Sequence, residues 1–160
     1  MDGPPLHPDV APLGFLLGSW MGEGKGFYST IEPFEYGEEI RVWHLGKPYL
    51  AYTQRTRALD DGRPLHGETG FWRMAGPGRV ELVCAHPNGH AEVSEGDLDG
   101  ASISLASTVI VSTSTAKALT KIERDLRVDG ETLTYDLRMA AVGQPLDGHL
   151  RAELRLGATH

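Results

Sequence analysis

Short runs of alternating apolar and polar residues make up most of this chain. Each run ends at a turn signal, and almost nothing has apolar residues at helical spacing. Period-two alternation over such short runs is typical of half-buried β-strands. We count about ten runs, at residues 20–27, 36–44, 49–57, 69–74, 80–86, 93–98, 103–109, 122–128, 133–139 and 150–156.

Tight turns join most of these runs. Asp99-Gly100 and Asp129-Gly130 are the clearest, since Asp-Gly predicts a hairpin turn in which both residues take positive φ. Neighbours in sequence should therefore be neighbours in space, and a meander of this length tends to close because closure removes unpaired edges. We predict an all-β fold, an antiparallel up-and-down barrel of about ten strands with room for one small ligand.

The start of the chain differs from the rest. Residues 1–8 are rich in Pro and Gly, and we expect them to be flexible. Residues 9–17 predict a short helical segment with Asp9 as its N-cap, ended by Gly18 and covering one end of the barrel. No repeat or linker interrupts the remainder, so residues 1–160 are predicted to form a single domain.

Composition excludes several classes of function. The chain has 22 acidic against 15 basic residues, a net charge of −7, which disfavours nucleic acid and anionic membranes as partners. Cys84 is the single cysteine, and in an apolar strand it predicts a small core residue rather than a nucleophile. The opening residues lack the basic and apolar regions of a secretion signal, and no apolar run approaches the ~18 residues of a membrane helix, so a cytoplasmic location is expected.

A glycine-rich stretch lies at the start of the first strand. Trp20, Gly22, Gly24 and Gly26 share one face of that strand. Glycines on one face indicate a sharp bend or a close approach by another group, with the indole plugging the barrel end. A phosphate-binding loop is disfavoured, because no Gly-Lys-Ser/Thr follows and no helix begins there.

The histidines show no metal-site spacing by themselves. They form no i,i+4 pair and have no cysteine partners, and no Gly-x-Ser-x-Gly elbow supports a hydrolase triad. From pattern alone, His149 beside Asp147-Gly148 would be a turn or strand-edge residue, and Lys117 a solvated lysine. The remaining histidines are interpreted as polar core or surface residues: His7, His44, His66, His86, His90 and His160.

Several short motifs together resemble the nitrobindin family, from about residue 13 to residue 156. They are Gly18-Ser19-Trp20-Met21-Gly22-Glu23-Gly24, Pro33-Phe34-Glu35-Tyr36, Gly46-Lys47-Pro48, Leu65-His66 with Glu68-Thr69-Gly70, Ala85-His86-Pro87, and Ala141-Val142-Gly143-Gln144-Pro145-Leu146 before His149.

This resemblance implies a fold, a cofactor and an activity. Nitrobindins are ten-stranded barrels, similar in shape to fatty-acid-binding proteins, that hold one haem b at the barrel mouth, bind nitric oxide and isomerise peroxynitrite to nitrate. By motif position, His149 is the expected axial iron ligand, and Thr30 and Lys117 are expected beside the haem. The resemblance implies no catalytic side chain beyond the iron, and a monomer or a homodimer. Ser29 stands where the family loop usually has proline, which should loosen that loop.

The position of His149 on its strand raises a difficulty. In an uninterrupted strand it would share the outward face with Arg151 and Glu153, while Leu150 and Ala152 face inward. We therefore expect a turn or a β-bulge at the start of this strand, which would let the imidazole lean over the mouth. Two other functions remain open: a non-enzymatic carrier of a fatty-acid-like molecule, and a nitric oxide carrier or sensor without turnover.

Overall fold

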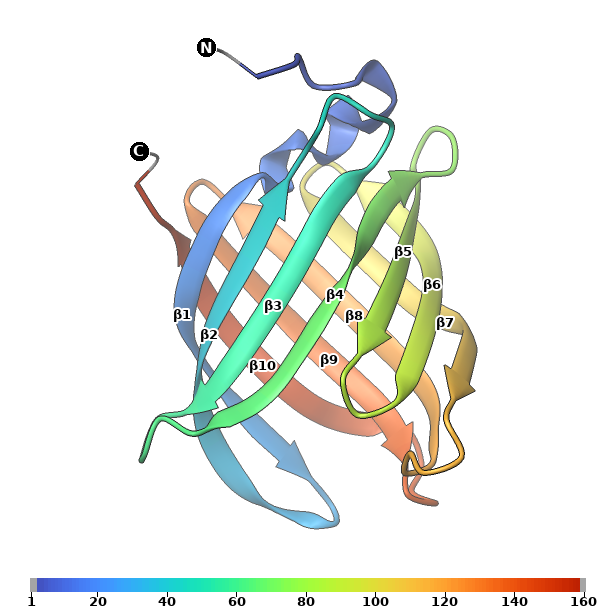
Figure 1. Cartoon of the computed structure of the whole chain (residues 1–160). Helices are drawn as coiled ribbons and strands as arrows, with labels where there is room; N and C mark the ends of the chain where they lie inside the picture. Colours follow the sequence, from blue (N-terminus) through green and yellow to red (C-terminus); the bar gives the residue numbers. More distant parts are fainter. Residues whose placement is uncertain (1–2, 159–160) are drawn as a thin grey trace.

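The structure is a closed barrel of ten antiparallel strands preceded by one short helix (Figure 1). It is a computed structural model that describes residues 3–158. Each strand pairs with its neighbours in sequence, and β1 pairs with β10 to close the barrel, so the predicted up-and-down architecture is confirmed. The elements are η1 (Pro8–Leu16), β1 (Gly18–Tyr28), β2 (Ile31–Trp43), β3 (Leu50–Ala58), β4 (Pro64–Met74), β5 (Arg79–His86), β6 (His90–Asp99), β7 (Ser102–Ser112), β8 (Leu119–Asp129), β9 (Thr132–Ala141) and β10 (Asp147–Leu156).

The helix η1 covers one end of the barrel, where Figure 1 shows it close to both termini. It is a 3-10 helix rather than an α-helix, and Pro12 inside it has no N–H for an α-helical hydrogen bond. Its cap is His7, whose Nδ1 accepts from the backbone N–H of Asp9, so the prediction of Asp9 as the N-cap was wrong. Three apolar side chains of η1 close this end of the core: Val10, Leu13 and Leu16.

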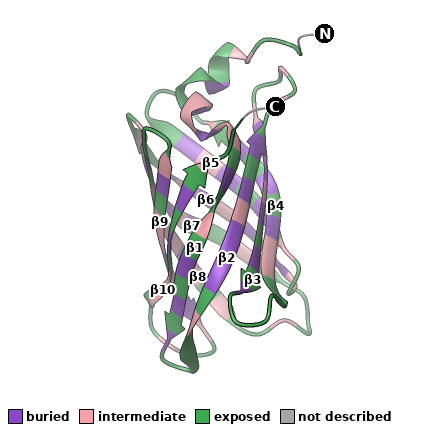
Figure 2. Ribbon diagram, turned by 90° about the vertical axis from the view of Figure 1, so that its left-hand side faces the viewer, coloured by how far each residue is buried: buried purple, intermediate pink, exposed green. Residues whose placement is uncertain are grey.

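Alternate residues of each strand point into the barrel, as Figure 2 shows by buried and exposed bands along the strands. The deepest core lies next to η1 and is built from apolar side chains, including Trp20, Leu50, Leu82 and Leu154. Among residues 3–158, no helix has both the length and the apolar character needed to cross a membrane.

Two hairpin turns differ in detail from the prediction. In the β6–β7 and β8–β9 turns the positive φ belongs to Gly100 (59°) and Gly130 (60°), and the preceding aspartates are the last strand residues. The central turn residues are therefore Gly100-Ala101 and Gly130-Glu131, the pattern of a type II′ turn with glycine first. Each hairpin forms where expected, but only the glycine needs the left-handed conformation.

Loops ring the end away from η1, here called the open end, and no helix formed by residues 3–158 lies over it (Figure 1). These loops join β1 to β2, β3 to β4, β5 to β6, β7 to β8, and β9 to β10. The starts of β4, β6 and β10 and the ends of β5 and β9 therefore lie at this end. Most of the residues that the sequence singled out as a site lie here.

Candidate functional site

The glycine-rich stretch of β1 lets neighbouring groups approach its backbone closely. A Cβ on Gly22 would clash with the backbone at Glu153, and one on Gly24 would lie 2.4 Å from the Tyr36 ring. The Trp20 indole is buried, and its N–H donates to the Leu16 carbonyl at 2.9 Å, which joins the barrel wall to η1. Gly18 has a φ of 131° at the junction between η1 and β1. The glycines therefore allow the close approach of neighbouring groups that the sequence predicted. Trp20 lies at the closed end, and Gly26, which pairs with Leu150, lies nearer the open end.

A β-bulge lies at His149. The register of β10 against β9 shifts between Gly148 and Leu150, so His149 has no paired partner on β9. A bulge breaks the alternation of faces. Leu150 and Ala152 can then face the core while His149 avoids the outward face that it would have in a regular strand. The expected bulge is confirmed.

Two neighbouring groups on β1 hold the His149 imidazole. Its Nδ1 lies 3.0 Å from the Phe27 carbonyl oxygen, and its ring meets the Tyr28 ring edge to face at 5.8 Å. Because a carbonyl only accepts, Nδ1 carries the proton and Nε2 keeps its lone pair. Burial lowers the pKa of His149, and the bond to Phe27 opposes that shift. The half-buried ring is thus a neutral imidazole with one free nitrogen ligand atom.

Tyr28 also fixes the loop that leads to His149. Its hydroxyl accepts from the Ala141 N–H at 3.0 Å and lies near the carbonyl oxygens of Met139 and Pro145. In the same loop Val142 has a φ of 48°, a strained conformation for a β-branched residue. The β9–β10 loop is therefore held in a specific shape by the end of β1.

Thr30 and Lys117 also lie at the open end. Thr30 is exposed in the β1–β2 turn, and Lys117 is exposed in the β7–β8 loop. They stand on separate loops from His149, so the fold brings the three predicted cofactor-binding residues to one end of the barrel. Their contact with a cofactor remains a prediction.

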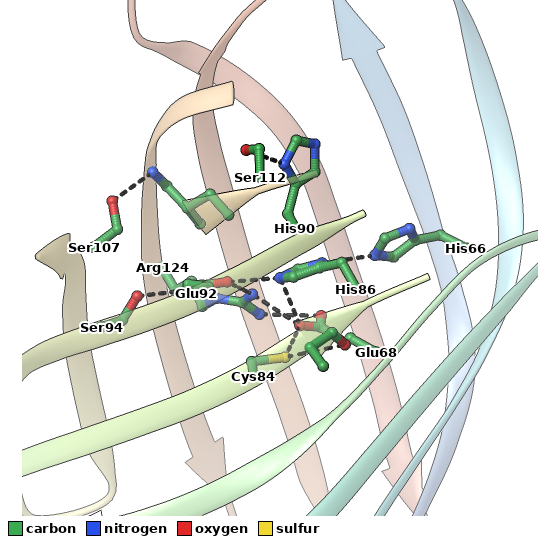
Figure 3. Close-up of polar contacts among 12 residues, drawn as sticks. His66, Glu68, Cys84, His86, His90, Glu92, Ser94, Ser107, Ser112 and Arg124 are labelled. Carbon is green, nitrogen blue, oxygen red and sulfur yellow. Dashed lines mark hydrogen bonds and ion pairs between the residues drawn. The ribbon is translucent and has the colours of Figure 1, made fainter. Parts of the chain in front are cut away.

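Deeper in the barrel lies a buried ionic cluster, drawn in Figure 3. The guanidinium of Arg124 on β8 donates to both oxygens of Glu68 on β4, at 3.1 and 2.9 Å. It also donates to both oxygens of Glu92 on β6, at 2.6 and 3.2 Å. One cation therefore joins two carboxylates across the interior.

The cluster keeps its carboxylates ionised despite their burial. Burial alone would raise the pKa of Glu68, but the charge and hydrogen bonds of Arg124 outweigh it and lower the pKa to about 2. The pKa of Glu92 is likewise lowered, against its burial, by Arg124, His86 and Ser94. Both groups are anions at neutral pH.

The same cluster has the donor types of a metal site. Ligand atoms of Glu68, Cys84, His86 and Glu92 lie within 4.8 Å of one another. Arg124, however, already donates to both carboxylates, and the Cys84 thiol donates to Glu68 at 2.8 Å. Burial followed by the charge of Glu68 raises the pKa of Cys84, so the thiolate that a metal needs is disfavoured. The two carboxylates are thus arranged to bind the guanidinium of Arg124 rather than a metal ion. Cys84 is the small core residue that the sequence predicted.

A second cluster of polar side chains surrounds Glu38. Gln54 donates to this carboxyl at 2.6 Å, and the hydroxyl of Tyr135 donates at 2.8 Å. Burial raises the pKa of Glu38 to about 7, although both hydrogen bonds oppose the shift. Beside it is a small cavity of about 40 Å³, lined also by Trp72. Among the described residues, Gln54 Oε1 and Trp72 Nε1 are buried without a protein partner, and a cavity of this size admits water to pair with them.

We predict that Glu38 makes stability fall as pH rises. A carboxyl with a raised pKa binds its proton more tightly in the folded protein, so stability is lost between the ordinary pKa of 4.5 and about 7. At ~1.4 kcal/mol per pKa unit this loss is roughly 3–4 kcal/mol. Glu38→Gln cannot ionise, so its stability relative to the parent should increase from pH 5 to pH 8 in urea unfolding. Glu23→Gln on the exposed face of β1 is the control, and equal pH dependence of Glu38→Gln and the parent would contradict the assignment.

The other histidines have local partners. His44 lies in the β2–β3 loop at the closed end, where its Nδ1 accepts from the Gly46 N–H. His90 is buried and bonded to the Ser112 hydroxyl at 2.8 Å. Both ring nitrogens of His86 are engaged, by Glu92 at 2.9 Å and by His66 at 3.3 Å. His160 lies outside the described residues. His86 is thus a polar core residue, as predicted, while His66 stands at the end of a bonded chain.

The sequence analysis missed the ionic cluster. Its signal was strand parity: Glu68 shares the inward face of β4 with Gly70 and Trp72, and Arg124 shares that of β8 with Ile122 and Leu126. Charged residues at inward positions on separate strands predict a buried ion pair once the strand order is known. The motif Glu68-Thr69-Gly70 was noticed only as part of a family resemblance.

Residues 9–155 match the family described as the THAP4-like, heme-binding beta-barrel domain. The chain belongs to this family. A peroxynitrite isomerase of Nocardia farcinica is 54% identical over 154 residues, which cover 94% of this chain and 92% of the relative. Peroxynitrite isomerase 2 of Mycobacterium avium is 52% identical over 153 residues, covering 93% of this chain and 95% of the relative. The resemblance noticed in the sequence is confirmed, and haem is the cofactor of the family.

Solved structures agree with the fold. The crystal structure of Rv2717c from Mycobacterium tuberculosis superimposes with a TM-score of 0.90 at 48% identity and covers 96% of this THAP4-like chain and 100% of that one. An S-type phycobiliprotein lyase from Guillardia theta has a TM-score of 0.66 at 8% identity, covering 91% of this chain and 90% of the lyase, and it supports the barrel fold alone.

Proposed function

We propose that this protein binds one haem b at its open end through Nε2 of His149 and isomerises peroxynitrite to nitrate. The observation that carries the proposal is the 3.0 Å hydrogen bond between Nδ1 of His149 and the Phe27 carbonyl. Haem-ligating and metal-ligating histidines usually donate their other ring N–H to a carbonyl or carboxylate, which fixes the tautomer and the ring orientation. The orientation and tautomer of His149 therefore support its role as the haem ligand.

The chain's own residues would position the cofactor and limit access to it. The bulge at His149 and the ring of Tyr28 would orient the imidazole, and Tyr28 also holds the β9–β10 loop that leads to it. Lys117 and Thr30, on loops of the same end, are proposed to contact the haem, with Lys117 as a point charge for a propionate. A ferric haem would supply an open Lewis-acid position for the peroxynitrite anion.

The reaction needs little from protein acids or bases. Peroxynitrite and nitrate contain the same atoms and the same charge, so isomerisation requires neither a net proton nor an electron. The chain's own residues would therefore need only to hold and orient the haem and to limit access to it. The proposal therefore fits a site whose named residues bind and orient, and the relatives named peroxynitrite isomerase support the choice of substrate. Nitric oxide is a further ligand that the same position could take.

A fatty-acid carrier is the less favoured alternative. The cavity beside Glu38 is about 40 Å³, far below the roughly 300 Å³ or more of small-molecule pockets. Charged and polar groups of the Glu38 and Arg124 clusters fill the middle of the barrel, where an acyl chain would have to lie. A nitric oxide carrier or sensor would use the same mouth, and only a turnover measurement separates it from an isomerase.

His149→Ala should weaken haem binding at least a hundredfold while the barrel stays folded. The ligand lies on a bulge at the rim, so its removal leaves the buried core unchanged. Haem titration followed by the Soret band measures the affinity, and circular dichroism checks the fold. His44→Ala at the closed end is the matched control and should bind haem as the parent does. An unchanged Soret band and affinity in His149→Ala would transfer the ligand role to another residue.

A further inference from the structure

A hydrogen-bonded chain connects the buried cluster to the open end. Glu92 lies next to Arg124 in the interior, His86 Nε2 lies 2.9 Å from Glu92 Oε1, and His86 Nδ1 lies 3.3 Å from His66 Nε2. Figure 3 shows Glu92, His86 and His66 in a row, with His66 at the end. The three residues come from adjacent strands β6, β5 and β4.

The charge of Glu92 sets the direction of this chain when His86 is neutral. An ionised carboxylate only accepts, so His86 donates its Nε2 proton to Glu92. A neutral His86 then presents Nδ1 as an acceptor, and His66 donates from Nε2. In that arrangement the other nitrogen of a neutral His66, Nδ1, keeps its lone pair. Alternation along the chain thus leaves a hydrogen-bond acceptor on His66.

His66 occupies the wall that faces His149. It is on the inward side of β4, near the start of that strand, and β4 is four strands from β10 in one direction around the barrel and six in the other. Burial lowers the pKa of His66; Glu68 opposes the shift, while the charges of His86, Arg124 and His149 add to it. The two imidazoles therefore lie on nearly opposite walls of the open end.

We propose that His66 is a proton acceptor for a ligand bound between it and His149, with His86 and Glu92 as its relay. This inference rests on the proposed haem site. A protonated ligand would give its proton to Nδ1 of His66, the Nε2 proton of His66 would move to Nδ1 of His86, and the ligand would remain as the anion. The new imidazolium at His86 is stabilised by the carboxylate of Glu92, 2.9 Å away.

The relay would affect ligands that arrive in a protonated form, including the proposed substrate. Peroxynitrous acid, the protonated form of the substrate, would be converted to the anion at the site by losing its proton to His66. The ligand class that depends on this step is therefore small weak acids that bind iron as anions. Ligands that bind without losing a proton, such as nitric oxide, should be indifferent to the relay.

Cyanide binding tests the proposal, because hydrogen cyanide is the neutral acid at pH 7 and binds ferric haem as the anion. In the haem-loaded protein, His66→Leu should slow cyanide association roughly a hundredfold, the usual range of one acid or base group. Glu92→Gln should slow cyanide association by a smaller factor. The amide of His86→Gln can accept from His66 and donate to Glu92, so the association rate of this variant should be closer to that of the parent than the rate of His86→Leu. Glu38→Gln, a buried carboxyl outside the chain, is the control and should not change the rate.

Two results would overturn the proposal. The first is a cyanide association rate in His66→Leu within a factor of two of the parent, with the haem still bound. The second is independent of haem: nitrogen NMR of the unloaded protein at neutral pH should find His66 protonated at Nε2 and bare at Nδ1, and a neutral Nδ1–H form would contradict the relay. Failure of the parent to bind haem would instead contradict the proposed function, and the NMR result would still decide the direction of the chain.

Discussion

Arg124→Met is expected to lower the free energy of unfolding by about 3–5 kcal/mol at pH 7, the cost of removing one partner from a buried ion pair. The substitution leaves Glu68 and Glu92 facing each other with no cation, and both are nearly inaccessible to solvent. Native domains are stable by about 5–15 kcal/mol, so this change should be among the most damaging single substitutions in the barrel. Urea unfolding of the haem-free protein measures it directly.

Controls separate the charge from the packing. Arg127→Met on the exposed face of β8 should change stability by less than about 0.5 kcal/mol. Adding Glu68→Gln and Glu92→Gln to Arg124→Met should recover most of the loss, because no unpaired charge then remains. A loss below 1 kcal/mol in Arg124→Met alone would mean that the two carboxylates are not held as ions by this residue.

The pH dependence of unfolding tests the same ion pairs in a second way. Glu68 has its pKa lowered to about 2, so the stability that it contributes is complete above its ordinary pKa of 4.5 and is lost as pH falls through about 2. The difference between the parent and Arg124→Met should therefore shrink between pH 5 and pH 2. Glu38 acts in the opposite sense, over the range from pH 4.5 to about 7. The two groups together predict greatest stability on the acid side of neutrality.

The fold was predictable because the strand signals are local. Alternation and turn residues located all ten strands, although β4 begins at Pro64, five residues before the predicted start at Thr69. The run from Pro64 to Glu68 contains a proline, a histidine and a glutamate, and this polar composition concealed the start of the strand. Only after the strand is extended back from Gly70 and Trp72 does its parity place His66 and Glu68 on the inward face. The turn types were predicted less well, since Asp-Gly was assigned as the central pair where the glycine alone is left-handed.

The site was predictable where a single residue broke a pattern. The wrong parity of His149 indicated a bulge, and the structure has one. The chain from Glu92 to His66 could not be found in this way, because its members lie on three strands and their contacts depend on the strand register. Thr30 and Lys117 came from family motifs, and their exposed positions at the open end leave their role to experiment.

The chemistry of the open end leads to a specific kinetic expectation. A ferric haem held by one imidazole should accelerate the loss of peroxynitrite and convert it to nitrate, protecting free tyrosine from nitration. The net charge of −7 gives an anion no long-range attraction, so access at the mouth should control the rate. We therefore expect the rate to change little with salt, since screening has little attraction to remove.

Stopped-flow decay of peroxynitrite, with nitrate and nitrite both quantified, tests the central claim most directly. Peroxynitrite should decay faster with the haem-loaded protein than in buffer alone, and the rate should increase in proportion to the protein concentration. Nitrate should increase at the expense of nitrite. Haem-free protein and the His149→Ala variant should leave both quantities near their protein-free values. Decay and nitrate yield at protein-free values in a sample with haem fully bound would contradict the isomerase, and the open end would then be better explained as a nitric oxide carrier or sensor.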